Sequence, residues 1–423
     1  MDKFKIHGPV RLEGRVRASG AKNAALPALA ATLLTDEPVE LHRMPSVRDI
    51  RTMCRLLEHL GWEATGCGDG VTLRRSGEES SVYDAPYELV KTMRASILVL
   101  GPQLARRGQA KVSLPGGCAI GHRPIEEHLK GMQALGAEVE LEGGYVHARC
   151  PRLRGAKYRF GVPTVTGTEN VMMAAVLAEG TTVLDNCARE AEIVALADQL
   201  VAMGARISGA GTPTIEIEGV PQLHGARVEI IPDRIEAGTY LIAAGITHGD
   251  VTVEDARPGD LAPLVERLRE AGVEVDEVAG GLRARADGRL KPALVVTEPH
   301  PGFPTDLQAQ FMALMTQAEG VSTVREFVFE NRFQHVPELN RMGADVRVKN
   351  RTAKVRGRTA LSGARVMATD LRASASLVLA GLVAKGTTVV DRIYHLDRGY
   401  ESMESKLQSL GARVERFSEP DAA

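Results

Sequence analysis

Several features that would mark particular protein classes are missing from this chain. The five cysteines are odd in number and include no Cys-X-X-Cys pair, which disfavours both a disulfide framework and a zinc site. No apolar stretch reaches the roughly 18 residues of a membrane span, and no apolar leader follows Met1. A net charge of −2 gives no electrostatic reason to expect a nucleic acid or an anionic membrane as partner. These absences predict a cytoplasmic protein.

The size and composition of the chain are those of a globular protein with more than one core. Its 423 residues suit two domains of about 200 residues each. The 44% of apolar residues and 25% of charged residues are typical of soluble proteins.

A short phrase, an apolar residue followed by glycine and a second apolar residue, recurs along the chain. Each copy closes a helical pattern and precedes an alternating, strand-like segment. A glycine in this place predicts a helix C-cap, because it enters the left-handed region without a Cβ penalty. The recurrence predicts six equivalent modules. The glycines, 68 to 75 residues apart, are Gly61, Gly136, Gly204, Gly272, Gly343 and Gly411.

Each module repeats a longer pattern that predicts its architecture. A nearly all-apolar first helix leads to a β-branched strand, an amphipathic second helix and two further strands. The first helices should be buried and the second helices should face outward, which places helices inside and sheets outside. The predicted fold class is α/β, with two inside-out α/β barrel domains of three modules each. The first helices are predicted at 23–34, 92–104, 168–178, 235–247, 306–318 and 370–384.

The modules divide the chain into two predicted domains. The first barrel spans residues 21–230, and the second comprises 1–20 plus 231–423. The last module has no terminal strand of its own, so residues 3–20 are expected to complete it. The crevice between the domains is then the default place for an active site.

Charged residues gather where the buried helices begin. An Asp or Thr there is first of all an N-cap, which suffices for Thr168 and Thr369 and can suffice for Asp233. Capping does not explain cations at the same place, because they oppose the helix dipole. Such cations imply an anion nearby, either an ion-pair partner or a ligand, and both alternatives stay open. They are Lys22, Arg94, Arg234 and Arg372.

A second set of arginines and one unusual loop complete the candidate site. Arg123, Arg189, Arg332 and Arg398 follow the first strands of their modules, where a guanidinium can bind carboxylate or phosphate. The loop 115–124 has three glycines and two prolines, so its Cys118 is a poor candidate for core packing. The thiol is a candidate nucleophile or proton donor.

Six longer runs resemble the UDP-N-acetylglucosamine 1-carboxyvinyltransferase family of enolpyruvyl transferases, whose fold is two inside-out α/β barrels. The resemblance spans essentially the whole chain. It implies transfer of enolpyruvyl from phosphoenolpyruvate to the 3′-hydroxyl of UDP-N-acetylglucosamine, with release of phosphate, as the first committed step towards peptidoglycan. No metal or organic cofactor is implied. The runs are Ser19–Pro27, Pro115–Cys118, Phe303–Asp306, Glu330–Phe333, Thr369–Ser374 and Asp391–His395.

The resemblance also implies roles for individual residues. Cys118 would protonate the methylene carbon, Asp306 would accept the hydroxyl proton, and Asp370 would assist proton transfer, with Lys22 and Arg398 as further catalytic groups. Phosphoenolpyruvate contacts are implied for Lys22, Asn23, Arg123, Arg332, Arg372 and Arg398. Contacts with UDP-N-acetylglucosamine are implied for Asn23, Arg94, Arg123, Pro124, Ile125, Glu126, Glu127, Thr164, Val165, Asp306 and Val328.

One segment departs from the family pattern, and two other functions compete. Residues 164–168 read Thr-Val-Thr-Gly-Thr where many members have Ser-Val-Gly-Ala-Thr, which leaves the uridine contacts at 162–165 open. A shikimate 3-phosphate transferase lacks the Pro-Gly-Gly-Cys loop. A catalytically silent sugar-nucleotide-binding paralogue has no reason to retain a set of five residues together: Lys22, Cys118, Asp306, Asp370 and Arg398. A monomer or weak homo-oligomer is expected.

Overall fold

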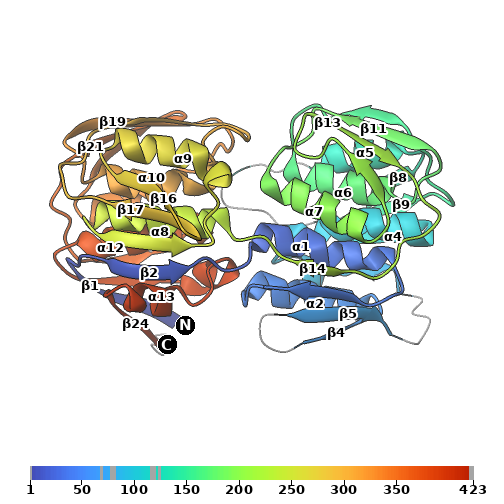
Figure 1. Cartoon of the computed structure of the whole chain (residues 1–423), viewed down its shortest axis with the longest axis horizontal. Helices are drawn as coiled ribbons and strands as arrows, with labels where there is room; N and C mark the ends of the chain where they lie inside the picture. The colour runs from blue at the N-terminus through green and yellow to red at the C-terminus, as the bar shows by residue number, and fades with distance from the viewer. Residues whose placement is uncertain (1, 67–69, 77–81, 115–120, 122–124, 419–423) are drawn as a thin grey trace. The chain divides into compact units, whose positions relative to one another are not determined.

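The computed structural model describes the chain except for residues 1, 67–69, 77–81, 115–120, 122–124 and 419–423. The described residues form two compact units (Figure 1). Of the described residues, unit A contains those within 20–114 and 125–231, and unit B contains those within 2–19 and 232–418 together with Gly121. Each unit has its own continuous apolar core.

Each unit contains three four-stranded sheets, and all six sheets of the described chain share one order of strands. A central strand pairs with one neighbour in parallel and with the other antiparallel, and a fourth strand pairs antiparallel beyond that. The repeated order confirms the predicted sixfold internal repeat. The central strands are β3 (Val39–His42), β7 (Gln109–Ser113), β11 (Thr181–Asp185), β15 (Asp250–Glu254), β19 (Gly320–Glu326) and β23 (Gly386–Asp391).

The remaining strands flank these six. Unit A has β4 (Trp62–Thr65), β5 (Val71–Arg75), β6 (Asp84–Ala85), β8 (Glu138–Glu142), β9 (Tyr145–Arg149), β10 (Lys157–Arg159), β12 (Arg206–Ser208), β13 (Thr214–Glu218) and β14 (Arg227–Glu229). Unit B has β1 (Asp2–Gly8), β2 (Glu13–Arg17), β16 (Glu274–Val278), β17 (Gly281–Arg285), β18 (Leu294–Thr297), β20 (Asp345–Lys349), β21 (Thr352–Gly357), β22 (Arg365–Met367) and β24 (Arg413–Ser418).

The apolar first helices form the interior of each unit, and the sheets surround them (Figure 1). In α8, every residue from Ile235 to Ile246 is buried. Helices inside and sheets outside make each unit an inside-out barrel, so the predicted fold class is confirmed. These helices are α1 (Lys22–Ala31) with η1 (Thr32–Leu34), η2 (Arg94–Val99) with α4 (Leu100–Arg107), α6 (Val165–Ala175), α8 (Arg234–Ile246), η3 (Thr305–Leu307) with α10 (Gln308–Met315), and α12 (Leu371–Val383).

The second helices end at the repeated glycine phrase as predicted. All six glycines have φ between 88° and 103°, the left-handed region that glycine enters most readily. The apolar residue before the glycine is buried in all six copies, of which the first is Leu60 and the last is Leu410. The helices of this outer set and the remaining short ones are α2 (Arg48–His59), α3 (Tyr87–Val90), α5 (Glu126–Ala134), α7 (Ala191–Ala202), α9 (Pro258–Glu270), α11 (Val336–Arg341), η4 (Ile393–Arg398) and α13 (Met403–Ser409).

The N-terminal segment closes two sheets rather than one. Strand β1 lies between β23 and β24 and pairs antiparallel with both, so it completes the last module as predicted. Strand β2, which was expected in the same sheet, instead pairs in parallel with β15 of the fourth module. Residues 9–12 separate the two strands, and they begin with Pro9, which cannot donate to a strand ladder.

Two of the three predicted helix caps are wrong. Helix α6 begins at Val165 with Thr164 as its N-cap, and Thr168 instead accepts a hydrogen bond from the backbone N–H of Ala188. Asp370, not Thr369, caps α12. The expected cap at Asp233 of α8 is confirmed, since its carboxylate accepts from the N–H groups of Ile235 and Glu236. No helix in the described part of the chain is long and apolar enough to cross a membrane.

Candidate active site

Unit B brings three of the predicted site residues into direct contact. The two carboxylate oxygens of Asp306, in η3, accept from Arg332 at 2.8 Å and from Arg372 at 2.9 Å. Both arginines are almost completely buried, with 3% and 4% of their surface exposed. Asp306 thus holds two guanidiniums in a desolvated place, where the carboxylate of Asp233 also acts on Arg372. Guanidinium donors held in such a place suit an anionic ligand.

The pairing of Arg372 leaves part of its guanidinium without a partner. Its Nη2 donates to Asp306, whereas its buried Nη1 has no acceptor among the described residues. Burial lowers the pKa of Arg372, but the carboxylate of Asp306 outweighs burial and raises it overall. The ion-pair alternative that the sequence left open is therefore confirmed for this residue. The ligand alternative stays a prediction, supported by a buried donor that has no acceptor in the described structure.

Asp370 and Arg398 lie close to the same helix. The carboxylate of Asp370 accepts from the backbone N–H groups of Arg372 at 2.9 Å and Ala373 at 3.1 Å, and so caps α12. Arg398 ends η4, which packs against α12. The cap fixes the start of the helix that carries Arg372.

Glu326 is a site residue that the sequence analysis missed. It is fully buried at the end of β19, and one carboxylate oxygen accepts from the N–H groups of Val328 and Phe329. The other accepts from the hydroxyl of Thr305, the residue before Asp306, at 2.9 Å. Glu326 thus fixes the position of Val328, a predicted substrate contact, relative to Asp306. A glutamate inside a β-branched strand was the available signal.

His335 was also missed. It is buried, and neither ring nitrogen has a hydrogen-bond partner in the described structure. Burial, assisted by Arg332 and opposed by Asp370, lowers the pKa of His335 to about 4. The ring is therefore neutral at pH 7 beside two predicted site residues.

In unit A, the predicted cation at the start of α1 is paired. The ammonium of Lys22 lies 3.3 Å from a carboxylate oxygen of Asp49, in α2, and both side chains are largely buried. Asn23 is the next residue of the helix, and Arg94 begins η2. Since α1 packs against η2, the structure brings these two helix starts into one region of unit A.

The N-termini of α5 and α6 carry the other predicted nucleotide contacts. Ile125 is the N-cap of α5 and is followed by Glu126 and Glu127, whereas Thr164 and Val165 start α6. Glu127 accepts from the N–H of Gly161 at 2.6 Å and from the hydroxyl of Tyr158 at 3.0 Å. Burial raises the pKa of Glu127, but these bonds outweigh burial and lower it overall. Its carboxylate holds the segment before α6 against α5.

A second pair of buried side chains joins the same two helices. His128 of α5 contacts Asn170 at 3.0 Å through Nδ1 and Thr166 at 3.2 Å through Nε2, both in α6. Asn170 in turn accepts from the backbone N–H of Gly101 at 2.7 Å. Burial and the nearby Arg94 lower the pKa of His128 to about 4, so the ring is neutral at pH 7. This pair, not foreseen from the sequence, sets the path of residues 164–166.

Three predicted site residues, Cys118, Arg123 and Pro124, lie outside the described residues. Of the other candidate cations, Arg189 lies in unit A and Arg234 begins α8 in unit B. The described part of the chain has no group of three His, Cys, Asp or Glu side chains placed to hold a metal ion.

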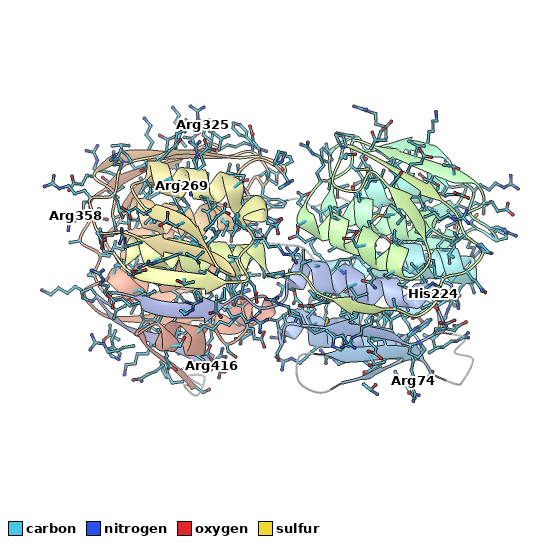
Figure 2. The ribbon with its side chains drawn as sticks, viewed as in Figure 1. Arg74, His224, Arg269, Arg325, Arg358 and Arg416 are labelled. Carbon is cyan, nitrogen blue, oxygen red and sulfur yellow. The ribbon has the colours of Figure 1, made fainter. Side chains whose placement is uncertain are left out.

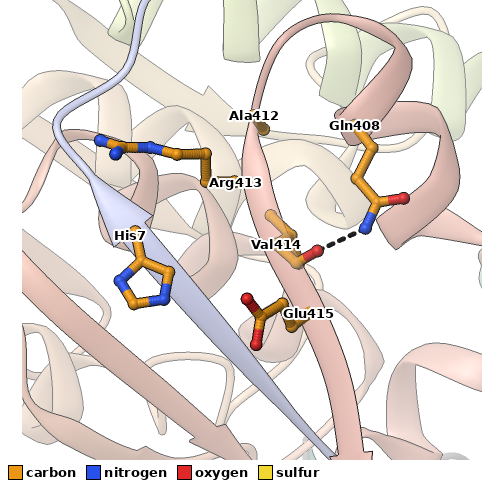
Figure 3. Close-up of a pocket in the computed structure, with 6 residues that line it drawn as sticks. All are labelled: His7, Gln408, Ala412, Arg413, Val414 and Glu415. Carbon is orange, nitrogen blue, oxygen red and sulfur yellow. Dashed lines mark hydrogen bonds between the residues drawn. The ribbon is translucent and has the colours of Figure 1, made fainter.

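Some other ion pairs and a hollow of the described structure involve none of the predicted site residues. The exposed Arg74 (Figure 2) forms a surface ion pair with Glu63 at 2.7 Å, a kind of pair that is typically worth little energy. Arg416 (Figure 2) has a side chain that is 29% exposed, and it pairs with the carboxylates of Asp2, Asp397 and Glu404. A hollow of about 400 Å³ in unit B lies beside β1 and β24 (Figure 3). None of its lining residues is a predicted site residue; they are His7, Gln408, Ala412, Arg413, Val414 and Glu415.

Comparisons with known proteins agree on one family. The sequence model of the EPSP synthase (3-phosphoshikimate 1-carboxyvinyltransferase) family matches residues 6–407. A UDP-N-acetylglucosamine 1-carboxyvinyltransferase of Anaeromyxobacter sp. (strain K) is 59% identical over 98% of this chain and 99% of its own length. One of Psychrobacter sp. (strain PRwf-1) is 55% identical over 99% and 97%.

Solved structures have the same fold. The enolpyruvyl transferase NikO from Streptomyces tendae aligns with a TM-score of 0.89 and 28% identity, over 99% of both chains. An EPSP synthase from Acinetobacter baumannii aligns with a TM-score of 0.76 and 17% identity, over 99% of this chain and all of its own, which shows the fold alone. The family predicted from the sequence motifs is therefore confirmed: the chain belongs to the EPSP synthase (3-phosphoshikimate 1-carboxyvinyltransferase) family and, within it, to the UDP-N-acetylglucosamine 1-carboxyvinyltransferases.

Proposed function

We propose that the protein transfers enolpyruvyl from phosphoenolpyruvate to the 3′-hydroxyl of UDP-N-acetylglucosamine and releases phosphate, the first committed step of peptidoglycan synthesis. Near-full-length relatives at 55–59% identity carry the name of this reaction. The structural observation behind the proposal is the pair of buried arginines on Asp306, with one Arg372 nitrogen left to donate. A doubly anionic substrate suits this arrangement.

The first part of the proposed mechanism is binding of phosphoenolpyruvate. Its phosphate and carboxylate would be neutralised by several cations, because a guanidinium presents paired donors and an ammonium adds a compact charge. Burial strengthens each of these contacts. The proposed cations are Lys22, Arg123, Arg332, Arg372 and Arg398, and Asn23 adds an amide contact.

The second part is addition followed by elimination. The sugar hydroxyl oxygen bonds to the central carbon of phosphoenolpyruvate while Cys118 gives a proton to the methylene carbon, and Asp306 takes the hydroxyl proton. A base must be ionised, and the two guanidiniums stabilise the ionised carboxylate of Asp306. The tetrahedral adduct then loses phosphate from the central carbon and a proton from the new methyl group, which restores the double bond. Asp370 would assist this second proton transfer.

The third part is binding of UDP-N-acetylglucosamine. We propose that the nucleotide lies along the starts of α5 and α6, where unpaired backbone N–H groups favour an anionic diphosphate. The hydrogen bonds of Glu127, His128 and Asn170 support this assignment, because they hold the two helix starts together. The proposed contacts are Arg94, Arg123, Pro124, Ile125, Glu126, Glu127, Thr164 and Val165, with Asn23, Asp306 and Val328 on the sugar.

The cellular location, the cofactor requirement and the oligomeric state of the enzyme are also proposals. A cytoplasmic location is supported by the free thiols of Cys54, Cys150 and Cys187, since oxidising compartments favour disulfides. The reaction needs neither a metal nor an organic cofactor, because phosphate leaves without redox chemistry. The expectation of a monomer or weak homo-oligomer stays a prediction.

Acceptor specificity tests the proposed function. Purified protein is incubated with phosphoenolpyruvate and either UDP-N-acetylglucosamine or shikimate 3-phosphate, and the rate of phosphate release is measured. Phosphate should appear with the sugar nucleotide and at a rate at least about 100-fold lower with shikimate 3-phosphate. Equal rates would refute the assignment, and no release with either acceptor would favour a sugar-nucleotide-binding protein without catalysis.

A further inference from the structure

A chain of buried polar side chains lies beneath the Asp306–Arg372 pair in unit B. Thr239 of α8, Gln310 of α10 and Tyr400, two residues after η4, are each at most 2% exposed. The Tyr400 hydroxyl lies 2.9 Å from the Thr239 hydroxyl and 3.1 Å from the side-chain nitrogen of Gln310. Three separate elements therefore meet at one phenol.

This network contacts both members of the pair. The side-chain nitrogen of Gln310 donates to the backbone carbonyl of Asp306 at 2.9 Å. The guanidinium carbon of Arg372 lies 5.4 Å from the centre of the Tyr400 ring, a cation–π contact. Burial raises the pKa of Tyr400, and the nearby Arg372 partly opposes this rise, as expected for two groups in close contact.

The network has a function that core packing alone does not need. An apolar side chain would fill the place of Tyr400 without requiring partners from α8 and α10. In this network the hydroxyls of Thr239 and Tyr400 and the side-chain nitrogen of Gln310 are hydrogen-bonded, whereas the side-chain oxygen of Gln310 has no partner among the described residues. Buried hydrogen bonds of this kind rigidify the groups they join. Here they join the backbone of Asp306 to the plane of Arg372, whose Nη1 has no acceptor among the described residues. Electrostatic catalysis depends on donors that are already oriented before the substrate binds.

We propose that Tyr400 is a positioning residue: its ring supports the guanidinium of Arg372, and its hydroxyl holds Gln310 against Asp306, so that Arg372 Nη1 is directed at the anionic substrate. Identifying that anion as phosphoenolpyruvate rests on the proposed function. Gln310 acts in the same network and Thr239 anchors it to α8.

Two substitutions of Tyr400 separate the hydroxyl from the ring. Tyr400→Phe keeps the ring and loses the hydroxyl, and Tyr400→Leu loses both. The matched control is Tyr240→Phe, because Tyr240 is a fully buried tyrosine of the same unit whose hydroxyl has no hydrogen-bond partner in the described structure. All three are compared with the wild type by kcat, by KM for each substrate and by Tm.

The expected result is a split between the kinetic constants. Tyr400→Phe should lower kcat by about tenfold and Tyr400→Leu by about 100-fold, with a raised KM for phosphoenolpyruvate, because a displaced guanidinium loses transition-state contacts. KM for UDP-N-acetylglucosamine and the activity of Tyr240→Phe should stay within about twofold of wild type. A kcat of Tyr400→Phe within about twofold of wild type would overturn the proposal, whatever its Tm.

A binding experiment distinguishes failure of this inference from failure of the proposed function. If the wild type releases no phosphate with UDP-N-acetylglucosamine, the proposed function fails, and titration calorimetry with inorganic phosphate then tests Tyr400. Binding to Tyr400→Phe that is at least about fivefold weaker than to Tyr240→Phe would support positioning of Arg372. Equal binding would refute it.

Discussion

Arg332 and Arg372 are buried charges, and the cost of removing them from water bears on ligand binding. A buried ion costs several kcal/mol of desolvation, and one carboxylate offsets only part of that cost for two guanidiniums. Arg372 Nη1 has no acceptor among the described residues, so an anion that reaches it gains a charge-assisted hydrogen bond in a desolvated place. The exposed ion pair of Arg74 with Glu63 lacks this property, because water already solvates both groups.

Asp370 combines a structural and a proposed chemical role, and substitution can separate them. Asparagine caps helices about as well as aspartate, so Asp370→Asn should change the free energy of unfolding by less than about 0.5 kcal/mol. Asp370→Ala removes the bonds to the N–H groups of Arg372 and Ala373 and should cost about 1 kcal/mol. If the carboxylate moves a proton, both variants should release phosphate at least about 100-fold more slowly. Full activity of Asp370→Asn would restrict the residue to capping.

The lowered pKa of His128 predicts how the free energy of unfolding depends on pH. Its pKa is about 4 in the folded protein, against about 6.5 when unfolded, so between these values only the unfolded state is protonated. The unfolded state then binds more protons, and stability falls as the pH falls from about 6.5 towards 4. Between pH 7 and pH 5 this residue alone should remove about 2 kcal/mol.

Urea unfolding followed by the fluorescence of Trp62 measures this effect in unit A, since Trp62 is the chain's single tryptophan and is buried in β4. His128→Gln cannot take up the proton and should lose about 2 kcal/mol less than wild type over the same pH range. Parallel pH profiles of the two proteins would contradict the prediction. Because all other titrating groups are common to both, they cancel in the comparison.

At the scale of elements, the same turn ends six helices, and its glycine can be tested in one copy. Gly411 has φ +94°, and a Cβ there would meet no atom closer than 3.9 Å. Gly411→Ala should therefore lower the free energy of unfolding by about 1 kcal/mol through backbone strain alone. Gly259, in α9 of the same unit, also has open space but no positive φ, so Gly259→Ala should leave stability unchanged or raise it. Equal effects of the two substitutions, measured by thermal unfolding, would contradict the strain argument.

The elements also show what could be read from the sequence. Helix ends at Gly61 to Gly411 were predictable because a local conformation requires glycine there. The start of α6 was not, because Thr166 is held by His128 of α5, which comes from elsewhere in the chain and also contacts Asn170 of α6. Local pattern assigned the cap to Thr168, whereas tertiary contacts decided it.

The residues of the candidate site divide in the same way, into those with a local sequence signal and those without one. An anion near each cation at a helix start was predictable, because a cation there opposes the helix dipole. Two of these cations, Lys22 and Arg372, have such an anionic neighbour.

Glu326 and Gln310 were missed because each lies within an apolar pattern, where a single polar residue carries no local signal. Tyr400 was missed because its partners Thr239 and Gln310 come from distant parts of the chain. Only the structure shows that Glu326 accepts from the hydroxyl of Thr305 and that Gln310 donates to the backbone carbonyl of Asp306.

At the scale of the whole molecule, the N-terminal strand β1 completes the last sheet of unit B. β1 contributes the inner strand of a sheet whose other members lie beyond residue 364, and Phe4 and Ile6 belong to the core of unit B. Unit B therefore cannot complete its core until residues about 380 positions apart have paired. Unit A has no such dependence on β1, since its sheets use strands between β3 and β14 only.

Deletion of residues 2–8 should consequently unfold unit B and spare unit A. Without β1, the paired edges of β23 and β24 are exposed, and exposed edges promote aggregation. The truncated chain should have about half the secondary structure of the wild type by circular dichroism, yet keep a cooperative Trp62 transition. Lys5→Ala, which retains the backbone pairing of β1, is the control and should behave as wild type. A truncated chain with wild-type secondary structure and phosphate release would show that β1 is dispensable, and the closure of unit B would then have to depend on β2 and the pairing of β23 with β22 alone.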